Sequence, residues 1–170
     1  MTEEIQKNKG VSRRTLVKGA AWSVPVIAAA VATPLAAASG DVEVGAFTVN
    51  GDCGVLGLGL LATGVEITAS PTAPLPAGTS IALTGTGLAN VGVVSVTGGL
   101  ASVSVVSPTT RNIVLDAPLA AGATLSLSTT INVAVAWTLT AVATLPAGYI
   151  GTGAKTTGGT TGTLILCNPN

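Results

Sequence analysis

The longest alternating run in the chain is Asn-Val-Ala-Val-Ala-Trp-Thr-Leu-Thr-Ala-Val-Ala-Thr, residues 132–144. Larger apolar side chains recur at every second position, which is the period of a β-strand. The face that they share is formed by Val133, Val135, Trp137 and Leu139, with Ala141 as a further candidate. We expect this run to be a central strand, with Trp137 in the core rather than on an aromatic ligand platform.

Shorter runs of the same kind lie on both sides of this strand, and no helical period follows Asp41. Pro- and Gly-rich turns separate them about every 8–12 residues, as in two-sheet β domains. The fold class predicted is therefore all-β: an antiparallel two-sheet sandwich of about seven to nine strands. The further strands expected are 41–49, 55–61, 65–69, 80–86, 91–96, 100–106, 111–116, 124–129 and 163–167, with 55–61 and 65–69 either two short strands or one strand bent at its glycines. A turn is expected at 50–52, a tight hairpin at 97–99 and a long surface loop at 151–162, where Gly and Thr dominate.

Two segments of the chain have similar sequences. Residues 73–83 align with residues 117–127 at an offset of 44, each with a proline and a glycine before an alternating strand, and residues 145–148 repeat the corner a third time. A stacked repeat protein needs at least three full units. We therefore interpret the similarity as one type of corner reused within a single domain.

The N-terminal region has the organisation of an export signal. Residues 12–18 read Ser-Arg-Arg-Thr-Leu-Val-Lys and precede an uncharged run that ends in three alanines, Ala36 to Ala38. This motif resembles the twin-arginine signal family at Ser12, Arg13, Arg14, Leu16, Val17 and Lys18. The resemblance implies a bacterial origin, export by the twin-arginine translocase in the folded state, and removal by a signal peptidase that accepts small residues.

We expect cleavage after Ala38, with Ala36 and Ala38 as the recognition positions and Ser39 as the new N-terminus. Residues 1–38 would then be the signal peptide and 39–170 a single secreted or extracellular domain. Two other interpretations remain: an ordinary secretory signal that contains Arg-Arg, and an uncleaved anchor over residues 20–38. The anchor approaches the roughly 20 residues that span a bilayer, but Pro25 and Pro34 interrupt it. All three place the domain outside the cytoplasmic membrane.

Removing the signal changes the charge balance. Five acids and two bases, Arg111 and Lys155, remain among 132 residues, so the net charge is −3. Two basic residues cannot neutralise a run of phosphates, which excludes electrostatic nucleic-acid binding and argues against anionic membrane surfaces. The exterior must consist of Thr, Ser, Gly, Ala and Asn.

Both cysteines, Cys53 and Cys167, follow the signal peptide. An even pair in an exported domain indicates a disulfide. In the chain-entropy model a loop of this length would stabilise the fold by about 4–5 kcal/mol. Two free thiols are the alternative.

Catalytic groups are scarce. Histidine is absent, so Ser or Cys nucleophiles lack their usual partner, and Lys155 lies in the glycine-rich segment. Asp41 and Glu43 share a strand face and could form a carboxylate pair, although we expect them to be solvated.

Calcium is the least implausible ion, with Asp41, Glu43 and Asp52 as ligands, but no loop has regular Asp spacing. Asp116 is expected to fix its own turn through backbone amides. We predict no catalytic residue, no metal and no cofactor.

The corner at residues 119–127, Leu-Ala-Ala-Gly-Ala-Thr-Leu-Ser-Leu, resembles the immunoglobulin-like modules of bacterial surface and adhesion proteins. That family implies a spacer or adhesive role without catalytic residues. The function predicted is a secreted or cell-surface, non-catalytic β-sandwich with a structural, adhesive or self-assembling role, whose expected contacts are other copies of itself or the cell wall. The alternative is a small secreted hydrolase or ligand-binding protein that uses Asp41, Glu43, Asp52 or Glu66.

Overall fold

An eight-stranded sheet and a separate two-stranded sheet make up the fold. The computed structural model describes residues 40–54, 63–163 and 166–170, and the backbone alone for 133–135. Every element in these ranges is a strand, which confirms the all-β prediction. The strands are β1 (Val42–Glu43), β2 (Thr48–Asp52), β3 (Thr63–Thr68), β4 (Ser80–Thr97), β5 (Ala101–Ser107), β6 (Thr110–Leu115), β7 (Thr124–Thr144), β8 (Tyr149–Ile150), β9 (Thr157–Thr163) and β10 (Cys167–Pro169).

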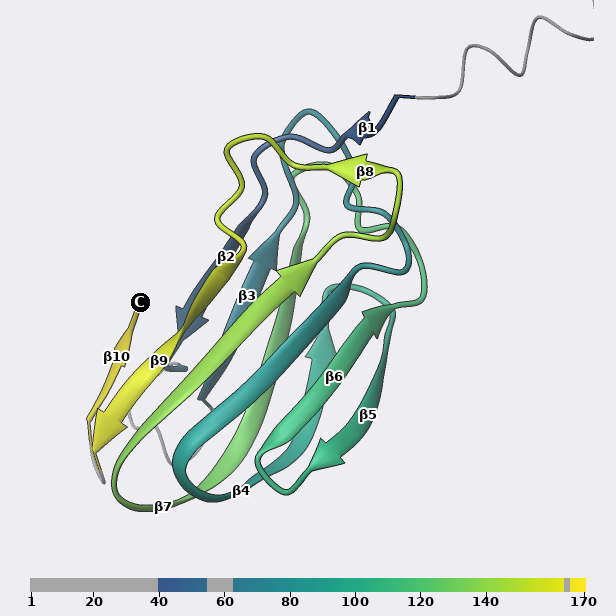
Figure 1. Ribbon diagram of the computed structural model, residues 1–170. Coiled ribbons are helices and arrows are strands. Elements are labelled where there is room, and N and C mark those ends of the chain that lie inside the picture. Colours follow the sequence, from purple (N-terminus) through teal and green to yellow (C-terminus); the bar gives the residue numbers. More distant parts are fainter. Residues whose placement is uncertain (1–39, 55–62, 164–165) are drawn as a thin grey trace, which may run out of the picture. The chain divides into compact units, whose positions relative to one another are not determined.

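The large sheet curves strongly because its two longest strands, β4 and β7, both bend. The first part of β7 lies between β3 and the end of β4, whereas its last part lies between the start of β4 and β9. Figure 1 shows both strands curving at the same end of the sheet. Register shifts within β4 accompany the bend, as bulges increase the local twist of a strand. The antiparallel sheet becomes a nearly closed, barrel-like structure.

One side of this barrel is closed between β2 and the last strands. The Val49 amide donates to the Lys155 carbonyl at 2.8 Å, and the Lys155 amide donates to the Phe47 carbonyl at 2.9 Å. The Gly51 amide donates to the Asn170 carbonyl at 3.1 Å. The predicted disulfide is present here: Cys53 and Cys167 are bonded, with Cα atoms 5.7 Å apart. A covalent bond therefore reinforces the closure.

The core fills the inside of the curved sheet through strict alternation. Along the last part of β7, Trp137, Leu139 and Ala141 are at most 3% exposed. Their neighbours Thr138 and Thr140 lie outward and are partly exposed. The prediction that Trp137 is a core residue is confirmed, and its indole N–H donates to the Thr163 carbonyl at 3.3 Å. The side chains of Val133 and Val135 lie outside the described part of the chain.

The two similar corners meet in space. Leu75 and Leu119 form an antiparallel bridge and are 1% and 4% exposed. Each donates its amide to the other's carbonyl at 2.9 Å. The segments before β4 and β7 thus bring the two long strands together at the end of the sheet opposite their bend.

Several predicted boundaries were wrong. The pairs 80–86 with 91–96, and 124–129 with 132–144, are each one continuous strand rather than two. Residues 50–52 continue β2 instead of forming a turn, because they pair with β3 through to Gly64. The strand expected at 55–61 lies outside the described residues.

The loop predicted at residues 151–162 was also wrong in part, because β9 begins at Thr157 and Gly158, Gly159 and Thr160 are buried. A Cβ atom on Gly159 would lie 2.0 Å from the Leu139 carbonyl oxygen, and one on Gly158 would lie 2.2 Å from the Val49 carbonyl oxygen. The glycines therefore permit close approach of β9 to its neighbours. At the C-terminus, β10 spans Cys167–Pro169 rather than 163–167.

The turn predicted at 97–99 is present, but the strands on its two sides do not pair with each other as a hairpin would. Gly98 has a positive φ of 84° and reverses the chain between β4 and β5. The end of β4 then pairs with β7, while β5 pairs with β6. The two strands that flank the turn diverge into different parts of the sheet, and a groove lies between them.

Candidate interaction surface

The groove between the second half of β4 and β5 is more apolar than the second hollow described below. Its volume is about 580 Å³, within the range of ligand-sized pockets. It is lined by Asn90, Val91, Gly92, Val93, Val94, Val103, Val105, Pro108 and Arg111. Neither Asp nor Glu is among these residues, so the groove presents an almost uncharged surface.

A bulge in β4 shapes one wall of the groove. The pairing of β4 with β7 shifts register between Val91 and Val94, which leaves Gly92 and Val93 without ladder partners. Val93 is 88% exposed as a result, whereas Val91 is fully buried. In a regular strand the side chain of Val93 would face the same side as that of Val91. The bulge turns it outward instead.

The other wall is β5, and its free edge carries hydrogen-bonding groups. Among the described strands β5 pairs only with β6. The Asp116 amide donates to the Leu100 carbonyl at 3.0 Å, and hydrogen-bonded and non-hydrogen-bonded positions alternate in antiparallel pairs. The backbone N–H and C=O groups of Ala101, Val103 and Val105 therefore point away from β6. They form an open edge of the sheet.

Exposed apolar side chains concentrate at this edge. Of ten large hydrophobic side chains that are exposed in the described residues, four lie in or directly before β5 and a fifth lies on β4 across the groove, so the edge and its groove are the main apolar feature of the surface. These five are Val93, Leu100, Val103, Val105 and Val106. Natural edge strands usually bear Lys, Pro or an inward charge that prevents pairing with other chains. β5 contains none of these residues.

Arg111 fixes the closed end of the groove. It is 9% exposed, and its guanidinium donates to the carbonyls of Ser107, Pro108 and Thr110 at 2.5–3.3 Å and to that of Val91. These bonds tie the β4 bulge to the turn before β6. The one charge that lines the groove is thus engaged by backbone carbonyls.

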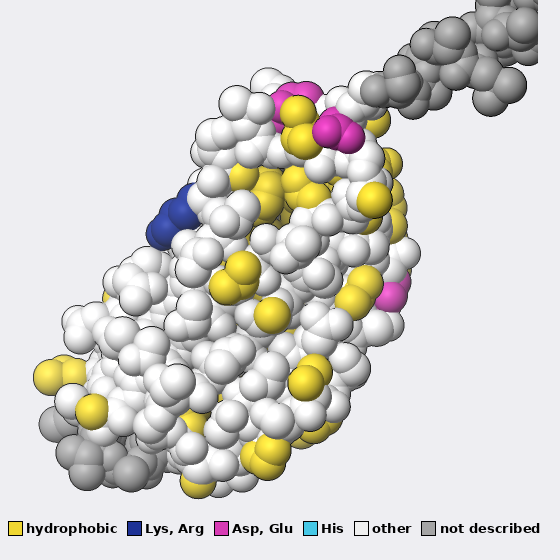
Figure 2. Space-filling model, viewed as in Figure 1, with side chains coloured by type: hydrophobic (Ala, Val, Ile, Leu, Met, Phe, Trp, Pro, Cys, Tyr) yellow, Lys and Arg dark blue, Asp and Glu magenta, His cyan; other side chains and the backbone are white. Residues whose placement is uncertain are grey.

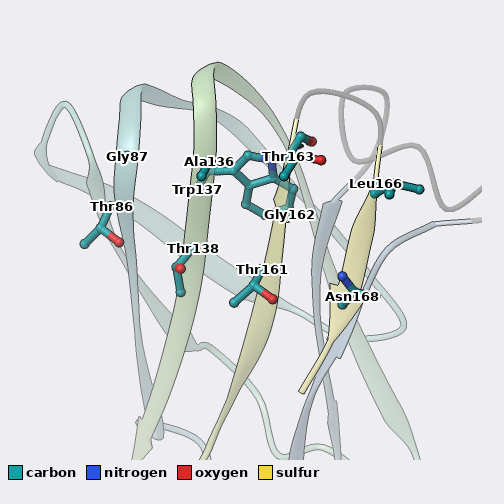
Figure 3. Close-up of a pocket in the computed structure, with 10 residues that line it drawn as sticks. All are labelled: Thr86, Gly87, Ala136, Trp137, Thr138, Thr161, Gly162, Thr163, Leu166 and Asn168. Carbon is teal, nitrogen blue, oxygen red and sulfur yellow. Dashed lines mark hydrogen bonds between the residues drawn. The ribbon is translucent and has the colours of Figure 1, made fainter.

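A second hollow of about 440 Å³ crosses four strands on the outer face of the sheet. Thr86, Thr138, Thr161 and Asn168 are successive cross-strand neighbours on β4, β7, β9 and β10. Figure 3 shows these four side chains in a row, with the Trp137 indole set apart from them beside Thr163. The lining offers hydroxyl and amide groups but no charge, and the tryptophan face is not available for stacking. The sequence analysis did not find this row, because its members are far apart in the chain.

Three of the acidic side chains, those of Glu43, Asp52 and Asp116, form hydrogen bonds with groups close to them. The carboxylate of Glu43 accepts from the Gly45 amide, the Thr152 amide and the Thr152 hydroxyl at 2.6–2.8 Å. These bonds, with that of the Thr152 hydroxyl the largest contribution, lower the pKa of Glu43 below its usual value. The prediction for Asp116 was wrong in its partner: both carboxylate oxygens accept from the Ser102 hydroxyl, at 2.9 and 2.8 Å, rather than from backbone amides.

The remaining predicted residues do not form a common site. Asp52 accepts from the Gly54 amide at 2.9 Å, and the Lys155 ammonium donates to Asn50 Oδ1 at 2.9 Å. Within the described ranges, no group of three or more His, Cys, Asp or Glu residues could hold a metal ion. The calcium ligands considered, Asp41, Glu43 and Asp52, are therefore not brought together. The signal motif and the cleavage positions Ala36, Ala38 and Ser39 lie outside the described residues.

The exterior is largely neutral and polar. Figure 2 shows a face on which backbone and side chains that are neither hydrophobic nor charged predominate, with hydrophobic side chains distributed over it and few charged ones. No helix among the described residues has the length and hydropathy needed to cross a membrane.

No family model matches the chain, and no curated protein matches it. Function must therefore be inferred from the surface itself. The sequence predicted a strand at 100–106, yet it did not show that this strand is an edge. The feature of the sequence that could have indicated an apolar edge is the presence of three valines in the four residues 103–106, with no charged residue beside them.

Proposed function

We propose that the chain is an extracellular, non-catalytic structural protein of a bacterial envelope, which acts by adhesion or self-association. Its main support is the exterior with few charged residues, combined with an apolar and uncharged sheet edge at β5. Soluble domains usually carry many charged surface residues and charges on their edge strands, which hold neighbouring molecules apart. A domain with seven charged residues among 132, and none on β5, is suited to close lateral contact.

The covalent closure fits this location. A disulfide between Cys53 and Cys167 persists in oxidising compartments outside the cytosol. The resemblance of the N-terminal motif to twin-arginine signals gives the route, and the resemblance of residues 119–127 to immunoglobulin-like surface modules suggests the class of architecture. Residues 41–170 form one compact unit, as expected of a single exported domain.

The alternative, a small hydrolase or acid-dependent ligand carrier, has less support. Neither hollow is lined by Asp or Glu, and Glu43, Asp52 and Asp116 each bond their own surroundings. Alanine substitution of Asp41, Glu43, Asp52 and Glu66 that removes a measurable activity without lowering the melting temperature would favour this alternative.

Cell fractionation tests the proposal. We expect the protein in the medium or the cell wall, with an N-terminus at or near Ser39. A variant with Arg13→Lys and Arg14→Lys should accumulate inside the cell, since the twin-arginine route requires both arginines. A variant with Lys7→Arg and Lys9→Arg is the matched control and should be exported normally. Intact protein that begins at Met1 and stays in the cytosol would overturn the proposal.

A further inference from the structure

We infer that β5 is a self-pairing edge: the β5 strands of two copies join antiparallel about a twofold axis at Val103. The partner is thus a second copy of this chain. This inference rests on the proposed structural role, to which it adds the surface and the register. In the pair, the large sheets of the two copies would become continuous across β5.

The backbone supplies the first reason. The N–H and C=O groups of Ala101, Val103 and Val105 face the open edge, as the bond from Asp116 to Leu100 requires. A twofold axis at Val103 sets Val103 against Val103 and Ala101 against Val105 of the other copy. All three outward-facing positions then obtain hydrogen-bonded partners at once.

The side chains give the second reason, because β5 is complementary to itself in this register. Its inner face carries Val103 and Val105, which line the groove, and its outer face carries Ser102 and Ser104. The axis places valine beside valine or alanine, and Ser102 beside Ser104. Apolar and hydroxyl cross-strand pairs of this kind stabilise antiparallel sheets.

Charge gives the third reason. A twofold pairing brings each charge near its own copy, so a charged edge would repel itself. β5 has no charged residue, and the Arg111 guanidinium is held by the carbonyls of Val91, Ser107, Pro108 and Thr110. A peptide of another protein would need no such symmetry of composition. The self-complementary sequence therefore favours a second copy over an unrelated strand.

The partner strand also covers the groove. Its Val103 and Val105 would lie on the side of the sheet where Val91, Val93 and Val94 form the opposite wall. One strand pair is small compared with the roughly 1,200–2,000 Å² of a stable interface. We therefore expect a concentration-dependent dimer rather than a permanent one.

Light scattering and sedimentation of the full chain with its disulfide intact provide the test. Wild-type protein should pass from monomer to dimer as its concentration rises. Val105→Lys places a charge in the pair, and Val103→Pro removes one outward N–H without touching a bond to β6. Each should weaken the dimer at least ~10-fold, a change that 1.4 kcal/mol produces. The matched control is Val142→Lys, also an exposed valine but on the outer face of β7, and it should associate like wild type.

A thiol at the axis tests the register. Both native cysteines are in the disulfide, so one added cysteine is the sole free thiol of the chain. Val103→Cys should give a covalent dimer under mild oxidation, whereas Ser102→Cys should not, since its neighbour across the axis is Ser104. Equal cross-linking of both variants would overturn the register.

The failures of the two proposals can be told apart. A wild-type protein that stays monomeric at all concentrations, or whose dimer resists both β5 substitutions while these variants keep the wild-type melting temperature, overturns the self-pairing. Such a protein found in the cell wall would leave the structural role intact. A dimer that responds to the β5 variants but remains in the cytosol would overturn the extracellular role alone.

Discussion

Leu75 and Leu119, 44 residues apart, exchange two backbone hydrogen bonds of 2.9 Å, and both side chains lie in the core. They occupy equivalent places in the two similar corners that precede β4 and β7. The reuse of one corner thus has a structural reason, because an antiparallel bridge between like segments fixes the starting points of the two longest strands.

Truncation of this bridge should be costly. Leu119→Ala removes a side chain that is 4% exposed, and we expect the free energy of unfolding to fall by about 2–5 kcal/mol. Leu100→Ala is the matched control, since Leu100 is 70% exposed and its truncation should cost less than about 0.5 kcal/mol. Denaturant unfolding of both variants measures the difference. Equal losses would show that the corner does not anchor the core.

A buried pair of hydroxyls links β3 to β9. Thr63 Oγ1 and Thr160 Oγ1 lie 3.0 Å apart, and both residues are fully buried. Thr160→Val leaves the Thr63 hydroxyl without this partner, which should cost about 1–3 kcal/mol. The double variant with Thr63→Val and Thr160→Val removes both polar groups and should be more stable than the single variant. If the free energy of unfolding falls in the double variant by the sum of the two single losses, the two hydroxyls do not interact and the pairing is contradicted.

The disulfide should contribute strongly to thermal stability. Its cysteines are 114 positions apart, and removal of a native disulfide typically costs about 2–5 kcal/mol. We expect the melting temperature to fall on complete reduction. The variant with Cys53→Ser and Cys167→Ser should melt at the lower temperature with or without reductant. A wild-type protein whose melting does not respond to verified reduction would contradict this expectation.

The Thr152 hydroxyl should control the titration of Glu43. Its bond favours the charged carboxylate, so Thr152→Val should raise the pKa of Glu43 toward its usual value. Because the folded-state pKa is lowered, the stabilisation is present at neutral pH and is lost as the pH falls through that lowered value. Carboxyl NMR titration measures the change. Thr156→Val should leave the Glu43 titration unmoved, and a matching shift there would argue against a specific bond.

Much of the fold could be predicted because two signals depend on local chemistry alone. The period of two along residues 137–143 reports which side chains are inside, since a strand presents alternate residues to the core. The cysteine pair reports a covalent link whatever the fold between them. Trp137 and the Cys53–Cys167 bond were both found in this way.

The parts that could not be predicted depend on neighbours in space. β9 has almost no apolar side chains to reveal it, because Gly158 and Gly159 are required by the backbones of Val49 and Leu139, which lie far away in the sequence. Likewise, the turn at Gly98 is local, but the choice of β7 rather than β5 as partner for the end of β4 is not. The open edge of β5 follows from that choice.

The position of Cys167 has a consequence for biogenesis. It follows β2 to β9 in the chain, so during synthesis the bond to Cys53 can form only after all of these strands have been made. The hydrogen bond between Val49 of β2 and Lys155, and the leucine-rich interior, can therefore assemble before this bond forms, without covalent help. Oxidation would then join two cysteines that the folded structure already holds close together. Translocation of a protein that is folded but still reduced would require this order.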